Sequence, residues 1–410
     1  MIKIYDTMTR SLRDFVPLTE NVVNMYVCGP TVYNYIHIGN ARSAVAFDTI
    51  RRYFEYCGYT VNYISNFTDV DDKIIKAANE AGISTKELSD KFIAAFMEDT
   101  GQLGIKPATQ NPRVINYMDE IIAFVSTLVD KGFAYVSEGD VYFRVAKSNN
   151  YAKLANKTLE DLEIGASGRT DAETERKENP LDFALWKAAK EGEVFWDSPW
   201  GPGRPGWHIE CSVMATEILG DTIDIHGGGA DLEFPHHTNE IAQSEAKTGK
   251  TFANYWMHNG FVNVDNEKMS KSLGNFVTVH DMLQTVDGQV LRFFLATQQY
   301  RKPINFTEKA IHDAEVNLKY LKNTHSLPLT EQVNQAELQT YLDAFQEAMD
   351  DDFNTANGVT VLFDMAKWIN SGNYDQTVKD AFEKMLQVFG IIFEEEVLDE
   401  DIEKLIEERQ

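Results

Sequence analysis

Four side chains that could bind a metal ion lie in three separate segments of this 410-residue sequence. Cys28 ends an apolar run, Cys211 lies in PGWHIEC, and His236 and Glu240 lie in FPHHTNEIAQSEA. His236 and Glu240 are four residues apart and share one face of a predicted helix that begins around Pro235, whereas His237 is turned ~100° away. A set of two thiolates, an imidazole and a carboxylate suits zinc. The alternative is two buried structural cysteines and two solvated helix residues.

Two polar loops could bind a phosphorylated ligand. The stretch YIHIGNAR leads from a predicted strand into a helix and places His37 and Asn40 at the turn, where free N–H groups and the helix dipole favour phosphate. The stretch KMSKS carries Lys268 and Lys271, which could close over a triphosphate and neutralise departing pyrophosphate. Taken singly, each stretch also fits a simpler interpretation, as a capped helix start or as a solvated basic turn.

The elements around these residues alternate between strands and helices. Strands are predicted at 24–28, 60–68 and 221–229, and helices at 41–58, from 69 onward and at 207–219. This order predicts an α/β fold with a Rossmann-like, doubly wound parallel sheet, an α+β insertion and a mainly helical C-terminal bundle. The predicted divisions are a first sheet half at 1–119, the insertion at 120–200, a second sheet half at 201–250, the region around KMSKS at 251–315 and the bundle at 316–410, with a break near THSLPLT.

Composition limits the compartment and the partners. The formal net charge of −26 argues against extensive nucleic-acid binding, although a locally basic track could still hold RNA. No apolar run approaches the ~18–20 residues that span a bilayer, and the N-terminus lacks the apolar core of a signal peptide. Three cysteines without a CxxC pair fit a reducing cytoplasm. We therefore expect a cytoplasmic protein with no membrane partner.

Together, the two loops and their surroundings resemble the signatures of class I aminoacyl-tRNA synthetases. The stretches MYVCGPTVYNYIHIGNAR, NFTDVDDKII, PGWHIECSVM, DIHGGGADLEFPHHTNEIAQSEA and KMSKSLGN are similar to bacterial cysteinyl-tRNA synthetases, and the similarity extends over essentially the whole chain. One departure is Asn40, which stands where the first signature has a second histidine. Asparagine also donates a hydrogen bond, so the departure affects only how much residue 40 contributes to binding ATP.

The resemblance implies a role for each group of residues. The implied zinc ligands are Cys28, Cys211, His236 and Glu240; the ATP signatures are His37, Asn40, Lys268 and Lys271; and the cysteinyl-adenylate pocket comprises Gly29, Thr31, Asn66, Thr68, Trp207, His226, Gly229 and Asp231. The remaining cysteine, Cys57, matches no ligand and is expected to be packed.

The implied reaction joins L-cysteine and ATP into cysteinyl-adenylate and then transfers cysteine to tRNA(Cys), with Mg²⁺ accompanying ATP and the enzyme acting as a monomer. Zinc would separate cysteine from serine. Deprotonating a thiol of pKa ~8.5 costs ~2 kcal/mol at neutral pH, whereas a water-like hydroxyl of pKa ~15.7 costs ~12 kcal/mol before any help from the metal.

Two other functions share these motifs. One is a ligase that couples activated cysteine to an amino sugar, as in the mycothiol pathway, and the other is a non-catalytic adenylate sensor. The sensor is disfavoured because both signature lysines and all four candidate ligands are present. The chain stops at IEKLIEERQ without a helix stop signal, so we expect a truncated chain that lacks an anticodon-reading domain.

Overall fold

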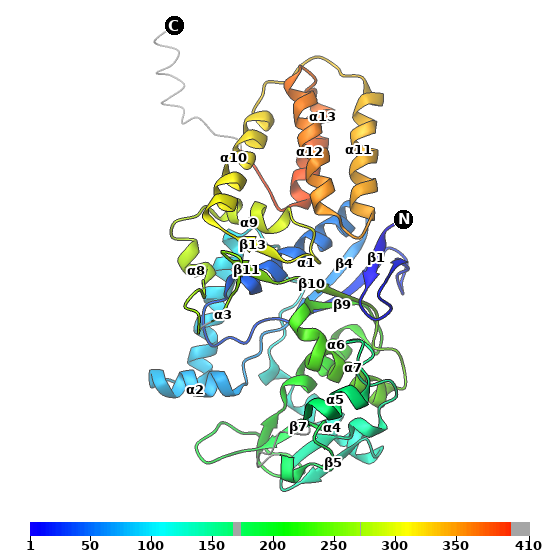
Figure 1. Cartoon of the computed structure of the whole chain (residues 1–410), viewed down its shortest axis with the longest axis vertical. Coiled ribbons are helices and arrows are strands. Elements are labelled where there is room, and N and C mark those ends of the chain that lie inside the picture. The colour runs from blue at the N-terminus through cyan, green and yellow to red at the C-terminus, as the bar shows by residue number, and fades with distance from the viewer. Residues whose placement is uncertain (167–173, 271, 395–410) are drawn as a thin grey trace.

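A four-stranded parallel sheet forms the centre of the molecule in the computed structural model, which describes residues 1–166, 174–270 and 272–394. Its strands follow the order β10 (Ala253–Asn259), β9 (Ile223–Gly229), β3 (Val22–Val27) and β4 (Thr60–Ser65). The sheet lies midway along the molecule, with a helical bundle at one end and the insertion at the other (Figure 1). The predicted Rossmann-like fold class is thus confirmed.

Helix α1 (Ile38–Tyr56) connects the two neighbouring strands β3 and β4. A parallel pair needs such a crossover, because the chain must return to the same end of the sheet. The inner side of α1 buries Val45, Phe47, Ile50 and Phe54 in the main core. The helix ends at Cys57, whose side chain is exposed, so the prediction that Cys57 is packed was wrong.

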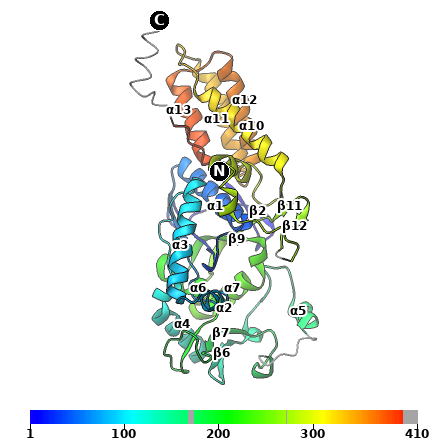
Figure 2. The same cartoon turned by 90° about the vertical axis from the view of Figure 1, so that its left-hand side faces the viewer.

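The insertion is an antiparallel sheet with helices beside it. Its strands are β5 (Ala134–Ser137), β6 (Asp140–Phe143), β7 (Phe183–Ala188) and β8 (Gly203–Pro205), and its helices are α4 (Met118–Asp130) and α5 (Leu159–Ala166). On the amino-terminal side it follows α2 (Asp72–Ala81) and α3 (Thr85–Gln102), and on the carboxyl-terminal side it leads into α6 (Trp207–Leu219) and α7 (Thr238–Thr248). Figure 2 shows this part below the central sheet, opposite the bundle.

The carboxyl-terminal part contains a small sheet and a bundle of long helices. The sheet comprises β11 (Val262–Val264), β12 (Glu267–Lys268) and β13 (Ile304–Phe306), with α8 (Val279–Met282) and α9 (Gly288–Ala296) between them in the chain. The bundle comprises α10 (Glu308–His325), α11 (Gln335–Asp350), α12 (Thr355–Asn370) and α13 (Gln376–Val388). A two-stranded hairpin, β1 (Lys3–Asp6) and β2 (Ser11–Asp14), begins the chain. None of the helices in the described ranges has the length and apolar composition needed to cross a membrane.

A buried ion pair ties the sheet domain to the bundle. Arg292 of α9 lies 2.6 Å from Asp48 of α1, and both side chains are almost fully buried. The guanidinium group also donates to the backbone carbonyl of Phe389, just after α13. Burial alone would raise the pKa of Asp48, but Arg292 and Arg52 outweigh it and hold that pKa below its ordinary value.

We predict that Asp48→Asn lowers the free energy of unfolding by ~3–5 kcal/mol, because it leaves a buried guanidinium unpaired. The depressed pKa also means that the pair stabilises the protein above the ordinary aspartate pKa of ~3.9 and loses this contribution as the pH falls through the folded-state value. Urea unfolding between pH 3 and 7 measures both effects. Asp313→Asn, which removes an exposed pair on α10, is the control and should change stability by less than ~1 kcal/mol.

Candidate active site

The residues predicted to do chemistry gather at the carboxyl edge of the central sheet. A cavity of about 700 Å³ opens there, as expected for ligands of open α/β sheets. Its wall includes nine of the predicted residues, namely Cys28, Gly29, Thr31, His37, Asn40, Trp207, Gly229, Asp231 and Lys268. Four more, Cys211, His226, His236 and Glu240, are buried beneath it.

The four predicted metal ligands form one cluster. The Sγ atom of Cys28 lies 3.4 Å from Cys211 Sγ, 3.4 Å from His236 Nε2 and 3.9 Å from Glu240 Oε2. Donors held ~2.0–2.3 Å from one tetrahedral ion lie ~3.3–3.8 Å apart. The cluster therefore fits one small divalent cation, and its thiolate, imidazole and carboxylate donors suit zinc.

A second layer of side chains orients these ligands. His226 contacts Glu240 Oε1 through its Nε2 atom at 3.0 Å, and His208 lies 3.0 Å from the other ring nitrogen of His236. The indole of Trp207 stacks on His236, with 4.1 Å between ring centroids. Metal ligands commonly have such outer partners, which fix the tautomer and the ring orientation.

The prediction for His237 was wrong. The prediction assumed a regular helix from about Pro235 onward, which would turn His237 away from His236 and Glu240. In the structure, α7 begins only at Thr238. The preceding residues, Glu233–His237, form a single wider turn in which Phe234 is extended. As a result His237 Nε2 also points at Cys28 Sγ, at 3.5 Å, and its other nitrogen lies 2.8 Å from His258.

Burial opposes charge throughout this cluster. Desolvation raises the pKa of the Cys28 thiol and of the Glu240 carboxyl, and it lowers the pKa of the His236 imidazole. His208 is also kept neutral, because burial lowers its pKa to about 3. A divalent cation supplies the positive charge that deprotonated thiols and a carboxylate need in such a place.

The first polar loop also serves as the cap of α1. His37 Nδ1 accepts a hydrogen bond from the backbone N–H of Asn40 at 3.2 Å, and Asn40 Oδ1 accepts one from the backbone N–H of His37 at 3.1 Å. This reciprocal arrangement is a capping box. Because the amide oxygen of Asn40 is used in the cap, its NH₂ group is the part that can donate to a ligand.

A close crossing of two chain segments shapes the floor of the cavity. The backbone N–H of Gly29 donates to Asn66 Oδ1 at 3.0 Å, and Asn66 Nδ2 donates to Thr68 Oγ1 at 3.2 Å. A Cβ atom at Gly29 would lie only 1.7 Å from the carbonyl oxygen of Asn66. Glycine is therefore required here. Asn66 and Thr68, both predicted for the pocket, are buried and do not line the cavity themselves, but Asn66 holds Gly29, which does.

The second polar loop borders the cavity from the small sheet. Lys268 ends β12, and its ammonium group lies over the ring of Phe261. The loop is braced internally, because Asn275 accepts from the backbone N–H of Ser270 and donates to the carbonyl of Lys268. Lys271, the other predicted lysine, lies outside the described residues.

Sequence reasoning missed three histidines that support the cluster, His208, His237 and His258. For His208 a signal existed, because it precedes Cys211 by three residues on one helix and so shares its face. For His237 and His258 no local pattern would have sufficed. Their contact joins the turn before α7 to the end of β10, and only the sheet topology brings these together.

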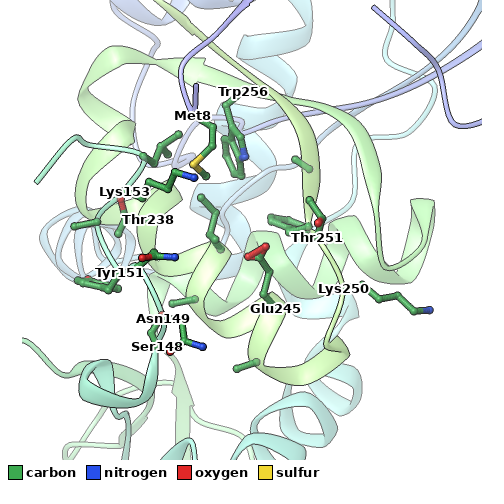
Figure 3. A pocket seen from close by; sticks show the side chains of 18 of the residues that line it. Met8, Ser148, Asn149, Tyr151, Lys153, Thr238, Glu245, Lys250, Thr251 and Trp256 are labelled. Carbon is green, nitrogen blue, oxygen red and sulfur yellow. The ribbon is translucent and has the colours of Figure 1, made fainter. Parts of the chain in front are cut away.

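A second cavity, of about 710 Å³, lies against α7 (Figure 3). Glu245 of α7, Lys153 and Trp256 line it, but none of the predicted site residues does. The indole of Trp256 stacks on His226 with 4.5 Å between ring centroids, so this ring separates the second cavity from the metal cluster. The chemistry predicted from the sequence belongs to the first cavity.

Comparison with known proteins identifies relatives over the whole chain. Residues 14–316 match the family described as tRNA synthetases class I (C) catalytic domain, and residues 344–394 match the DALR domain. The chain is 94% identical to a cysteine–tRNA ligase of Streptococcus thermophilus (strain CNRZ 1066) and 84% identical to one of Streptococcus pyogenes serotype M28 (strain MGAS6180), in each case over 100% of this chain and 92% of the relative.

A solved structure supports the fold. The methionyl-tRNA synthetase of Mycobacterium tuberculosis in complex with methionyl-adenylate superposes with a TM-score of 0.65. The alignment covers 90% of this chain and 89% of that chain at 16% identity.

We predict that the protein, purified without added metal, contains ~1 zinc ion per chain. Cys211→Ser should lower the metal content and increase the rate of metal loss to a chelator, because it removes a thiolate ligand. Cys57→Ser is the matched control, since Cys57 is exposed and lies outside the cluster. Elemental analysis measures the stoichiometry, and full metal retention by Cys211→Ser would contradict the assignment.

Proposed function

Since the chain belongs to the cysteine–tRNA ligase family of class I aminoacyl-tRNA synthetases, we propose that its metal cluster selects the substrate thiol and that its two polar loops position ATP. Family membership also decides between the functions that the sequence left open, in favour of tRNA over an amino sugar as the acceptor. The cytoplasmic location and the monomeric state stay predictions.

The enzyme catalyses two group transfers. In the first, a carboxylate oxygen of cysteine attacks the α-phosphorus of ATP, the bond from that phosphorus to the β-bridging oxygen breaks, and pyrophosphate leaves. In the second, a hydroxyl of the 3′-terminal adenosine of tRNA attacks the carbonyl carbon of cysteinyl-adenylate, and AMP leaves. Mg²⁺ accompanies ATP in this chemistry. Both steps depend mainly on positioning and on neutralising phosphate charge.

One observation carries the proposal for the metal. Cys28 belongs both to the buried donor cluster and to the wall of the cavity, so a substrate in the cavity can reach an ion held by the cluster. Zinc bound there supplies affinity for a thiolate, which cysteine forms readily near neutral pH and serine does not. Cys28, Cys211, His236 and Glu240 hold the ion in this proposal.

The pocket residues hold the amino acid and the adenylate. Asn66, itself held by Thr68, fixes Gly29 in the wall of the cavity, while Trp207 closes one side and keeps His236 in place. His226 fixes Glu240. These residues act by orientation, since each is held by a neighbour before any substrate arrives.

The nucleotide side of the pocket is built from loops. Gly29 and Thr31 line the approach to the phosphates. Gly229 ends β9 and Asp231 follows it at the same edge of the sheet, where they suit the nucleoside. Burial raises the pKa of Asp231, and the positive charge of Lys268 partly offsets this shift.

The charge-neutralising groups lie at the loops. The N-terminus of α1 is capped by His37 and Asn40. Its backbone N–H groups and the positive end of the helix dipole attract the phosphates. Lys268 and Lys271 neutralise the charge that builds on pyrophosphate as it leaves. This assignment makes the lysines matter more in the transition state than in the bound ground state.

We predict that Lys268→Ala lowers kcat for cysteine-dependent ATP–pyrophosphate exchange by ~10²-fold or more while the KM for cysteine stays nearly constant. The reason is that the lost charge acts on the transition state. Lys309→Ala is the control, because Lys309 is an exposed lysine of α10 paired only with Asp313. A variant Lys268→Ala with unchanged kcat and a raised KM for ATP would contradict the assigned role.

We predict that Trp207→Ala raises the KM for cysteine and weakens zinc retention together, because the indole both borders the cavity and stacks on a ligand. Steady-state exchange assays and elemental analysis on one preparation measure the two effects. Trp196→Ala, in the loop before β8, is the control. Loss of cysteine affinity with normal zinc retention would show that the stack does not support the metal.

A further inference from the structure

A single carboxylate, that of Asp352, joins three parts of the molecule. Asp352 lies between α11 and α12, it is almost fully buried, and both Asp352 and Phe353 have positive φ angles, of 52° and 53°. Non-glycine residues rarely adopt this conformation, and it persists only where the surroundings enforce it. The backbone is thus bent sharply at the point where the bundle meets the sheet domain.

On one side, the carboxylate holds the segment that follows α9. Tyr300 Oη donates to Asp352 Oδ1 at 2.6 Å, and Arg301 Nε donates to Asp352 Oδ2 at 2.7 Å. The bundle makes further contacts with this region, because Gln299 Nε2 donates to Asp352 Oδ2 at 3.4 Å and Thr355 Oγ1 donates to the carbonyl of Gln298 at 2.9 Å. Hydrogen bonds to an ionised acceptor are short and about twice as strong as neutral ones.

On the other side, the same residue is fixed by the first strand of the chain. The backbone N–H of Tyr5 donates to Asp352 Oδ1 at 2.9 Å, and the backbone N–H of Asp352 donates to the carbonyl of Lys3 at 3.0 Å. Strand β1 is bonded to β10 at its end, because the backbone N–H of Trp256 donates to Asp6 Oδ1 and the backbone N–H of the next residue, Thr7, donates to the carbonyl of Trp256. Asp352 is therefore anchored to the central sheet.

The segment held by Asp352 leads directly to the small sheet that carries Lys268. The backbone N–H of Gly260 donates to the carbonyl of Tyr300 at 2.8 Å, and a Cβ at Gly260 would lie 2.5 Å from the backbone of Lys302. Strand β13 begins at Ile304 and pairs with β11, which pairs with β12 and thus with Lys268. A shift of Tyr300 would therefore move the strands that present Lys268.

Helix α1, which follows the first polar loop, also forms hydrogen bonds with the end of α9 and the segment after it. Arg42 of α1, almost fully buried, donates to the carbonyls of Leu295 at 2.7 Å and Gln299 at 2.9 Å. The segment from Leu295 to Lys302 is thus held from the α1 side by Arg42 and from the bundle side by Asp352.

We propose that Asp352 is a positioning residue for the activation step, because it sets the segment 299–301 and through it the strands β11, β12 and β13 that present Lys268 to the cavity. The inference rests on the role of Lys268 proposed above. The bundle thereby takes part in forming cysteinyl-adenylate, in addition to any contact it makes with tRNA.

The decisive variant is Tyr300→Phe, which removes one hydrogen bond to Asp352 but keeps the Asp352 carboxylate itself. Its matched control is Tyr135→Phe in the insertion, because Tyr135 Oη donates to the buried Asp182 at the same distance of 2.6 Å. Both variants lose a tyrosine–carboxylate bond, and Tyr135→Phe also loses the bond that its hydroxyl accepts from the backbone N–H of Glu178. Of the two tyrosines, only Tyr300 is connected to the small sheet. A purely structural role predicts the same behaviour for both.

We expect Tyr300→Phe to lower kcat of ATP–pyrophosphate exchange about tenfold, the rate equivalent of one charged hydrogen bond, with the KM for cysteine and the zinc content unchanged. Amide hydrogen exchange of residues 262–268 should become faster. Tyr135→Phe should lose a similar amount of thermal stability, while its kcat and the exchange of residues 262–268 stay at the level of the unmodified chain.

Two results would overturn the inference. One is a Tyr300→Phe variant whose kcat and amide exchange at 262–268 match those of Tyr135→Phe. The other is a Tyr300→Phe variant with faster amide exchange at 262–268 but unchanged kcat, in a protein whose Lys268→Ala variant is inactive. The small sheet would then depend on Asp352 for its rigidity, but this dependence would not affect the rate. If instead Lys268→Ala retains full kcat, the proposed role of Lys268 fails, and this outcome is separate because it does not involve Tyr300.

Discussion

The active site depends on the parallel pairing of β3 with a neighbour on each side. Because β4 and β9 both run in the direction of β3, their carboxyl ends reach the same edge, and the residues that follow them meet there. Cys28 follows β3, Asn66 follows β4 and Gly229 ends β9. No single strand carries a complete site. A slip of one residue in either pairing would turn alternate side chains to the opposite face and separate the donor cluster from the cavity.

Two buried arginines, Arg42 and Arg292, connect α1, α9 and the end of α13 next to the central sheet. Arg42 donates to backbone carbonyls only, and burial lowers its pKa to about 10. Arg292 is paired with Asp48 and also donates to Phe389. A buried charge without partners is very unfavourable, so each guanidinium enforces the approach of the segments that satisfy it. The relative positions of α1, α9 and the end of α13 are thereby specified by polar groups inside an otherwise apolar core.

Local patterns predicted the elements well where the chain is regular. The helix predicted at 207–219 coincides with α6, because Gly206 and Gly220 bracket one apolar segment. The four residues predicted as metal ligands do lie in one cluster, but spacing alone related only His236 to Glu240, and the resemblance to a known family supplied the complete set. The prediction for His237 failed because Phe234 interrupts the helical geometry just upstream of α7, and no pattern in the sequence marks this interruption. The contacts of Asp352 could not be predicted, because they join Tyr5, Tyr300 and the bundle across long separations in sequence.

The segment from Cys28 to Asn40 connects the donor cluster with the N-terminus of α1. Its first residue, Cys28, belongs to the donor cluster proposed to hold the metal, and its last, Asn40, completes the cap of α1 that is proposed to receive phosphate. The segment is fixed in the middle, because Thr31 pairs with Thr68 and the backbone N–H of Val32 donates to the carbonyl of Thr68 at 3.1 Å. At its far end, the backbone N–H of Ile38 donates to the carbonyl of Val277 at 3.1 Å, beyond the second polar loop. If a thiol binds at the donor cluster and a triphosphate binds at α1, as proposed, one short and well-fixed piece of backbone determines the positions of both. Such a piece can hold a carboxylate and an α-phosphorus at a reactive separation without waiting for a domain to close.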